Sequence, residues 1–208
     1  MQIMSLLRRL FNPKHKKSDE KAKKADQSEH SSYYPEEKLP LDERFTHNFR
    51  KNGGKFIYCE DWEEVLEAFD NILLENDWYE QEVFCVNEKL CKRFEGFNLE
   101  FNRKTNSAFF LSECESLIAH TGAIMLSSNQ IKEKKLQDLP ANVVVFATTS
   151  QIVDTISEGL RIINNRRSGH IPSNITTIQH FEEENKEKDF MSYGSSTKNL
   201  YLLLLEDL

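Results

Sequence analysis

Residues whose side chains could take part in chemistry gather in two stretches, and residues 115–122 form the first. This stretch holds Glu115, His120, Thr121 and Gly122 beside an apolar run. A carboxylate near a titratable imidazole suits proton transfer, and open α/β sheets bind ligands at their strand ends. The same residues also fit a structural turn, because a glycine here can supply a positive φ or a close backbone approach. We treat all four as candidate ligand-binding residues and assign none of them a catalytic role.

The second stretch, residues 193–198, has the composition of a loop that could bind a small anion. It offers hydroxyl groups, one glycine and one cation immediately before an apolar C-terminal run. A polar turn that leads into a strand has the same composition. A serine nucleophile would need a base and an oxyanion hole, and no nucleophile-elbow motif is present. The candidates for a small carboxylate or phosphate are Tyr193, Gly194, Ser195, Ser196 and Lys198.

The cysteines give no sign of a metal or redox centre. Cys59, Cys85, Cys91 and Cys114 form no CxxC or Cys/His pair at metal-ligating spacing. Iron–sulfur clusters need such cysteine-rich spacing. We therefore expect reduced thiols, no metal and no other cofactor, and no dehydrogenase activity of the isolated chain.

Charge and hydropathy argue against two classes of protein, nucleic-acid binders and membrane-spanning proteins. The net charge of −7 argues against a general nucleic-acid binder, which needs a basic surface. No apolar run approaches the ~18 residues of a membrane span, and no secretory signal is present. These features predict a cytoplasmic protein that binds no nucleic acid.

The N-terminal region differs from the rest of the chain. Residues 1–17 carry five Lys/Arg and no acid, and Ile3, Leu6, Leu7 and Leu10 recur at helical spacing. We predict a short basic amphipathic helix that can contact a partner or, weakly, an anionic membrane surface. Polar residues up to position 38 predict a disordered linker.

From residue 39 to 208 the pattern predicts a single α/β domain. Helices and strands alternate, and the runs 123–126 and 143–147 are apolar enough for a buried parallel sheet. Helices are expected from Leu41 to the Asn52-Gly53-Gly54 stop, over 61–75 and 87–94, and from Thr149 or Ser150 to Ile163, with strands over 55–59, 82–86, 108–111, 123–126, 143–147, 174–178 and 199–205.

The sequence CESLIAHTGAIMLSS, residues 114–128, followed by LPANVVVF, residues 139–146, resembles the core signature of the LUD domain, the lactate-utilisation family. Glu115 matches the acidic position of the family, Thr121 and Gly122 its Thr-Gly pair, and Leu139-Pro140 its Leu-Pro pair. The resemblance spans roughly residues 40–208. It implies a three-layer, mostly parallel fold of the ribose-phosphate isomerase and CoA-transferase type (NagB/RpiA/CoA transferase-like).

Two functions remain open for this chain, which resembles a lactate utilisation protein C-like member of the LUD family. The first is an accessory protein of organic-acid (lactate) utilisation that binds a small anion, performs no redox chemistry and has partners in an iron–sulfur lactate-oxidising complex. The second is a non-catalytic interaction or regulatory protein that kept the fold and lost the site. The Gly-Pro-Ser loop of the family is replaced by residues 179–185, which include three consecutive glutamates, and this favours the second function. The retained Thr-Gly turn favours the first. His120 stands where the family usually has a carboxylate.

Overall fold

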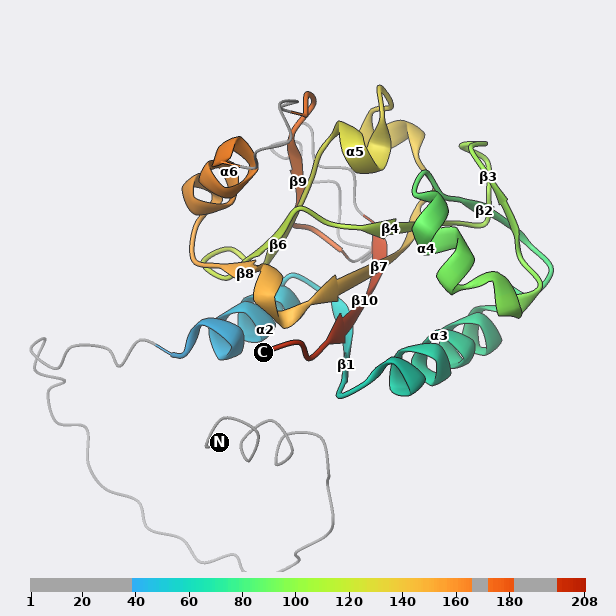
Figure 1. The fold of residues 1–208 in the computed structure, drawn as a ribbon, viewed down its shortest axis with the longest axis horizontal. Helices are drawn as coiled ribbons and strands as arrows, with labels where there is room; N and C mark the ends of the chain where they lie inside the picture. The colour runs from blue at the N-terminus through green and yellow to red at the C-terminus, as the bar shows by residue number, and fades with distance from the viewer. Residues whose placement is uncertain (1–38, 166–171, 182–197) are drawn as a thin grey trace, which may run out of the picture. The chain divides into compact units, whose positions relative to one another are not determined.

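Six parallel strands form the larger of two sheets, in the order β1-β10-β7-β4-β2-β3 (Figure 1). The structure is a computed structural model of the 208-residue chain and describes residues 39–165, 172–181 and 198–208. The strands are β1 (Lys55–Cys59), β2 (Glu82–Phe84), β3 (Glu100–Asn102), β4 (Phe109–Glu113), β7 (Asn142–Thr148) and β10 (Asn199–Leu205). The predicted α/β class with a parallel sheet is confirmed.

The most apolar strands lie at the centre of this sheet. Residues Val143–Ala147 of β7 and Leu200–Leu204 of β10 are buried without interruption. Such continuous burial requires both faces of the sheet to be covered, which is why these strands read as apolar runs rather than as alternating patterns. The C-terminal run, predicted as a buried strand, lies between β1 and β7.

A smaller mixed sheet of four strands corrects the prediction of a single sheet. Its order is β8-β5-β6-β9, and β6 runs antiparallel to both of its neighbours. The strands are β5 (Ser116–Ile118), β6 (Ala123–Leu126), β8 (Ile152–Val153) and β9 (Thr176–Ile178). The run 123–126, expected in the parallel sheet, is β6. Residues 119–122 are too few for a parallel crossover, so β5 and β6 form a hairpin.

Five helices of the described residues connect or cover these sheets. They are α2 (Leu41–Lys51), α3 (Trp62–Asn76), α4 (Glu88–Arg93), α5 (Ser128–Ile131) and α6 (Ile156–Asn165), with 3-10 turns at η1 (Glu95–Phe97), η2 (Leu136–Asp138) and η3 (Thr149–Gln151). Asp61 caps α3 by accepting a hydrogen bond from the Glu64 backbone N–H at 2.9 Å, as its spacing to Glu64 predicted.

The last helix begins later than predicted. Thr148 and Gln151 form a reciprocal cap around η3. The next two residues pair with Leu117 and Ile118 as β8, and α6 starts only at Ile156. Pairing within the small sheet therefore overrides the helical periodicity of residues 152–163.

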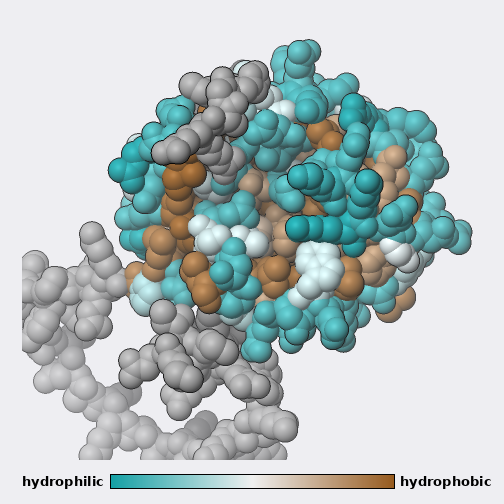
Figure 2. Space-filling model, in the orientation of Figure 1, coloured by the Kyte–Doolittle hydropathy of each residue, from teal (hydrophilic) through white to brown (hydrophobic). Residues whose placement is uncertain are grey.

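The packing places the sheets and helices in successive layers. Val144, Phe146, Tyr201 and Leu203 face the apolar side of α3 and α4. The alternate residues of the same strands face α2 and the small sheet. The outer face of the small sheet packs against Ile163 of α6. Hydrophilic residues cover most of the face shown in Figure 2, with apolar residues showing between them.

Several predictions concern residues outside the described ranges. They include the basic helix and linker over residues 1–38 and the candidates Tyr193, Gly194, Ser195 and Ser196. Within the residues that the structure does describe, no helix has both the length and the apolarity needed to cross a membrane.

Candidate functional site

A cavity of about 710 Å³ opens at the carboxyl-terminal edge of the larger sheet. Its walls come from the ends of β2, β3, β4 and β7 and from α5 with the turn that follows it. The lining residues include Asn87, Glu88, Lys89, Arg103, Ser112, Glu113, Cys114, Glu115, Asn129, Gln130, Lys132 and Gln151. Open α/β sheets bind ligands at this edge, so the cavity is the best candidate site.

Glu115 forms the most buried part of the acidic wall. Its side chain is 2% exposed, and its Oε1 accepts hydrogen bonds from Ser127 Oγ at 2.6 Å and Asn129 Nδ2 at 2.9 Å. Ser127 also caps α5 together with Gln130. The first turn of α5 therefore holds the Glu115 carboxylate in place, and its donors offset part of the cost of burying the charge.

Glu113 is held in a similar way from the opposite helix. The Asn87 Nδ2 donates to Glu113 Oε2 at 2.7 Å. The Asn87 Oδ1 accepts from the backbone N–H groups of Lys89 at 2.9 Å and Leu90 at 3.4 Å, which caps α4. One asparagine thus fixes both the start of α4 and a carboxylate of the cavity.

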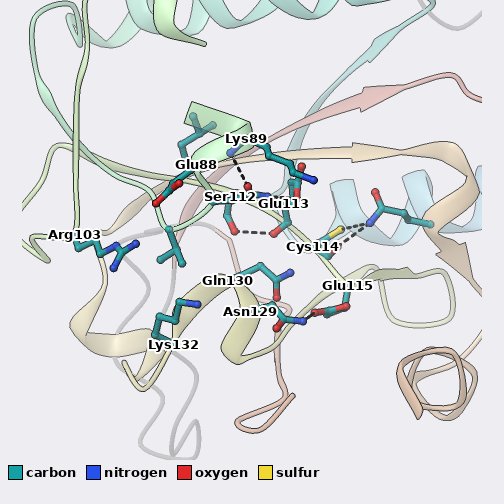
Figure 3. Close-up of a pocket in the computed structure, with 14 residues that line it drawn as sticks. Glu88, Lys89, Arg103, Ser112, Glu113, Cys114, Glu115, Asn129, Gln130 and Lys132 are labelled. Carbon is teal, nitrogen blue, oxygen red and sulfur yellow. Dashed lines mark hydrogen bonds between the residues drawn. The ribbon is translucent and has the colours of Figure 1, made fainter. Parts of the chain in front are cut away.

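Cationic side chains face these carboxylates across the cavity. Figure 3 shows Arg103 and Lys132 on one side of the view and Glu113 and Glu115 on the other. Arg103 and Lys132 are exposed, and neither forms a salt bridge with any residue in the described ranges. Both cations are therefore available to an anionic ligand.

The combination of groups suits a ligand that is both anionic and hydroxylated. Guanidinium and ammonium groups bind carboxylates through charge-assisted hydrogen bonds, whereas ionised carboxylates accept hydrogen bonds from hydroxyl groups. No cluster of three His, Cys, Asp or Glu suited to a metal ion occurs within residues 39–165, 172–181 and 198–208.

The predicted residues Thr121 and Gly122 lie in the β5–β6 turn and contact α2 instead of the cavity. Gly122 has a φ of 65°, and a Cβ added there would lie 2.4 Å from the backbone of Asn48 and Phe49. Asn52 Nδ2 donates to the Thr121 carbonyl at 2.7 Å. The Thr-Gly pair therefore allows the hairpin to approach α2 closely.

The other described candidates are also outside the cavity. His120 is exposed, and its backbone N–H donates to the Asp154 carbonyl at 3.0 Å. Lys198 is buried, and its Nζ donates to the carbonyls of Leu139 at 2.8 Å and Pro140 at 3.0 Å. Burial lowers the pKa of the Lys198 ammonium. Of the five predicted residues that the structure describes, Glu115 lines the cavity.

Sequence reasoning missed Asn87, Arg103, Glu113 and Lys132. A signal existed for Asn87 and Glu113, because both follow predicted strands, and the carboxyl ends of parallel strands share one edge. Arg103 follows β3, a three-residue strand that the pattern did not reveal. Lys132 lies in a charged stretch with nothing to distinguish it from its neighbours.

Comparison with known proteins identifies the chain's relatives. The family model described as the LUD domain matches residues 100–205. The fold is similar to a crystal structure of a DUF162 family protein from Deinococcus radiodurans, with a TM-score of 0.54 and 14% identity over 80% of this chain and 96% of that chain. At that identity the likeness shows the fold alone. No curated protein matches the sequence.

Proposed function

Because the chain belongs to the LUD domain family, as its signature predicted, we propose that it binds a small hydroxylated organic acid in the cavity beside Glu115. The proposal rests on one observation. Carboxylates held in place by hydrogen bonds lie at the ligand-binding edge of a parallel sheet together with cations that form no salt bridge within the described ranges. The cavity volume lies within the roughly 300–1,000 Å³ of small-molecule sites.

The cations would bind the carboxylate of the ligand. The planar guanidinium of Arg103 can donate two parallel hydrogen bonds to a carboxylate, and Lys132 adds a second positive charge. The side chains of Glu113 and Glu115 would accept hydrogen bonds from the hydroxyl groups.

The balance of charge favours a monoanion over a phosphate. Three acids and three bases line the cavity, namely Glu88, Glu113, Glu115, Lys89, Arg103 and Lys132. A dianion would meet repulsion from the nearby carboxylates, whereas a hydroxy acid uses both kinds of group.

Membership of the family also supports a proposed role in the cell. We place the chain as an accessory protein of organic-acid (lactate) utilisation, without redox chemistry of its own and with partners in an iron–sulfur lactate-oxidising complex. Its six parallel strands, covered by helices on one face, also support a relation to the NagB/RpiA/CoA transferase-like fold.

Thermal unfolding of the full chain against a ligand panel tests the proposal. The panel contains hydroxy acids from lactate to sugar acids, the matched acids without hydroxyl groups, and matched polyols without a carboxylate. A ligand at 100 times its Kd should stabilise the fold by about 2.7 kcal/mol, which is a shift of several degrees. Hydroxy acids should give the largest shift.

Two variants locate the binding. Arg103→Met and Lys132→Met should abolish the shift, whereas Lys134→Met should retain it. Lys134 is an exposed cation on the same loop, outside the cavity, and serves as the matched control. A flat panel, or an unchanged shift in Arg103→Met, would contradict the proposal and favour the interaction protein, for which pull-downs with and without residues 1–38 are the next experiment.

A further inference from the structure

Two of the cysteines, Cys85 and Cys91, lie near α4 and next to the candidate site. Cys85 directly follows β2 and Cys91 lies in α4. The Asn87 carbonyl oxygen accepts from Cys85 Sγ at 3.5 Å and from the Cys91 backbone N–H at 3.0 Å. The Cys91 thiol is near enough to contribute to the raised pKa of the Cys85 thiol. Both residues line a second cavity of about 390 Å³.

The two thiols differ in accessibility. Cys91 is half-buried, whereas Cys85 is 5% exposed. Glu88, Lys92 and Arg103 line the same second cavity as the two cysteines. An oxidant that enters this cavity therefore reaches Cys91 first.

The surroundings of Cys85 suit the second partner of a disulfide. Burial, followed by the neighbouring Cys91 thiol, raises the pKa of Cys85, so Cys85 stays protonated and unreactive towards oxidants in solution. It nevertheless lines the same cavity as Cys91, and the Asn87 carbonyl accepts a hydrogen bond from each of the two residues. The other two cysteines, Cys59 and Cys114, are buried.

We propose that Cys85 and Cys91 form a redox-active pair that a hydroperoxide converts into an intramolecular disulfide. The Cys91 thiolate attacks a peroxide oxygen, so that an S–O bond forms, the O–O bond breaks and hydroxide, or the corresponding alkoxide, leaves with a proton from solvent. The Cys85 sulfur then attacks the Cys91 sulfur as its own proton departs, the S–S bond forms, and the S–O bond breaks with loss of water. The two sulfurs lose two electrons in total, and the peroxide gains them.

The disulfide would also act on the ligand cavity. It brings the sulfurs to about 2.05 Å and closes a ring over residues 85–91. The Cys85 hydrogen bond to the Asn87 carbonyl is then lost. Because the Asn87 side chain caps α4 and holds Glu113, oxidation should displace a wall of the ligand cavity. This second step rests on the proposed function, and the disulfide itself does not.

Peptide mapping of the oxidised full chain tests the disulfide without any ligand. The protein carries Cys59→Ala so that Cys85 is the sole cysteine between Lys55 and Lys89. After hydrogen peroxide treatment, denaturation and alkylation, trypsin cleaves at Lys89 and should release residues 56–89 linked to residues 90–92. The intact mass should fall by two hydrogen atoms, and a thiol reductant should restore it.

Matched variants show whether the link is specific. Cys91→Ser should abolish the linked peptide, and Cys114→Ala should retain it. A Cys91 sulfinic acid beside an alkylated Cys85, or two fully alkylated thiols, would overturn the inference. The ligand panel run on the oxidised and reduced protein separates the two proposals, because a disulfide without any ligand response refutes only the proposed function.

Discussion

Replacing Gly122 by alanine tests whether the Thr-Gly turn acts by holding α2 against the small sheet. The new Cβ would lie 2.4 Å from the Asn48 carbonyl carbon and the Phe49 nitrogen. These are backbone atoms, so the contact cannot be relieved by rotating a side chain. The helix or the hairpin has to move.

The cost can be worked out from the contacts that this movement affects. A non-glycine residue with positive φ costs about 1–2 kcal/mol. Asn48 Nδ2 donates to the Ala119 carbonyl at 2.9 Å, and Asn52 Nδ2 donates to Thr121 at 2.7 Å. Each such hydrogen bond contributes roughly 0.5–1.5 kcal/mol. We therefore expect Gly122→Ala to lower the free energy of unfolding by about 2–5 kcal/mol.

Urea unfolding followed by circular dichroism measures this change, with Gly96→Ala as the control. A Cβ at Gly96 would meet no atom within 4 Å. That variant should be neutral or more stable by about 0.4–1 kcal/mol. Equal unfolding midpoints for the two variants would refute the reasoning. Loss of ligand stabilisation in a Gly122→Ala protein of unchanged stability would instead support the prediction that Gly122 binds the ligand.

Two further predictions concern Lys198 and Asn87. Lys198→Met should lower the free energy of unfolding by about 1–3 kcal/mol because two buried carbonyls lose their donor. Burial lowers the Lys198 pKa from 10.5, so the unfolded chain binds more protons between the folded pKa and 10.5. The stability due to Lys198 therefore rises with pH across that window, and a deficit of the Met variant that fails to grow with pH would contradict this. Asn87→Ala should cost about 1–2 kcal/mol of stability through loss of the α4 cap. Asn87→Ser should recover most of the cap while still lacking the amide that reaches Glu113, and equal urea midpoints for the Ala and Ser variants would show that the cap contributes little.

Much of the fold was predictable because its signals are local. Residues only a few positions apart create the Asp61 cap and the apolar stripe of α3. The same is true of the uninterrupted apolar runs in β7 and β10. The second sheet was missed because an apolar run such as Ala123–Leu126 predicts that the strand is buried but does not indicate which strand it pairs with. The short connection before it was the signal that the run belongs to a hairpin.

The candidate site was predictable only in part. Glu115 was identified from its family motif, and it lines the cavity. The Thr-Gly pair of the same motif lies at the other end of β5, against α2. Residues of one sequence motif are close along the chain. A strand of three residues is nevertheless long enough to place Glu115 at the cavity and the Thr-Gly pair against α2.

The amino-acid sequence by itself determined most of the helices and strands, because capping, periodicity and apolar runs act over a few residues. The tertiary structure alone decided that Asn87, Arg103, Glu113 and Lys132 share one cavity, and that Cys85 and Cys91 line a second one. Asn87, Arg103 and Glu113 come together because β2, β3 and β4 run parallel and end at one edge, and Lys132 joins them from the turn after α5. Which strands pair is set by long-range packing of the whole chain, and no local pattern in the sequence specifies it.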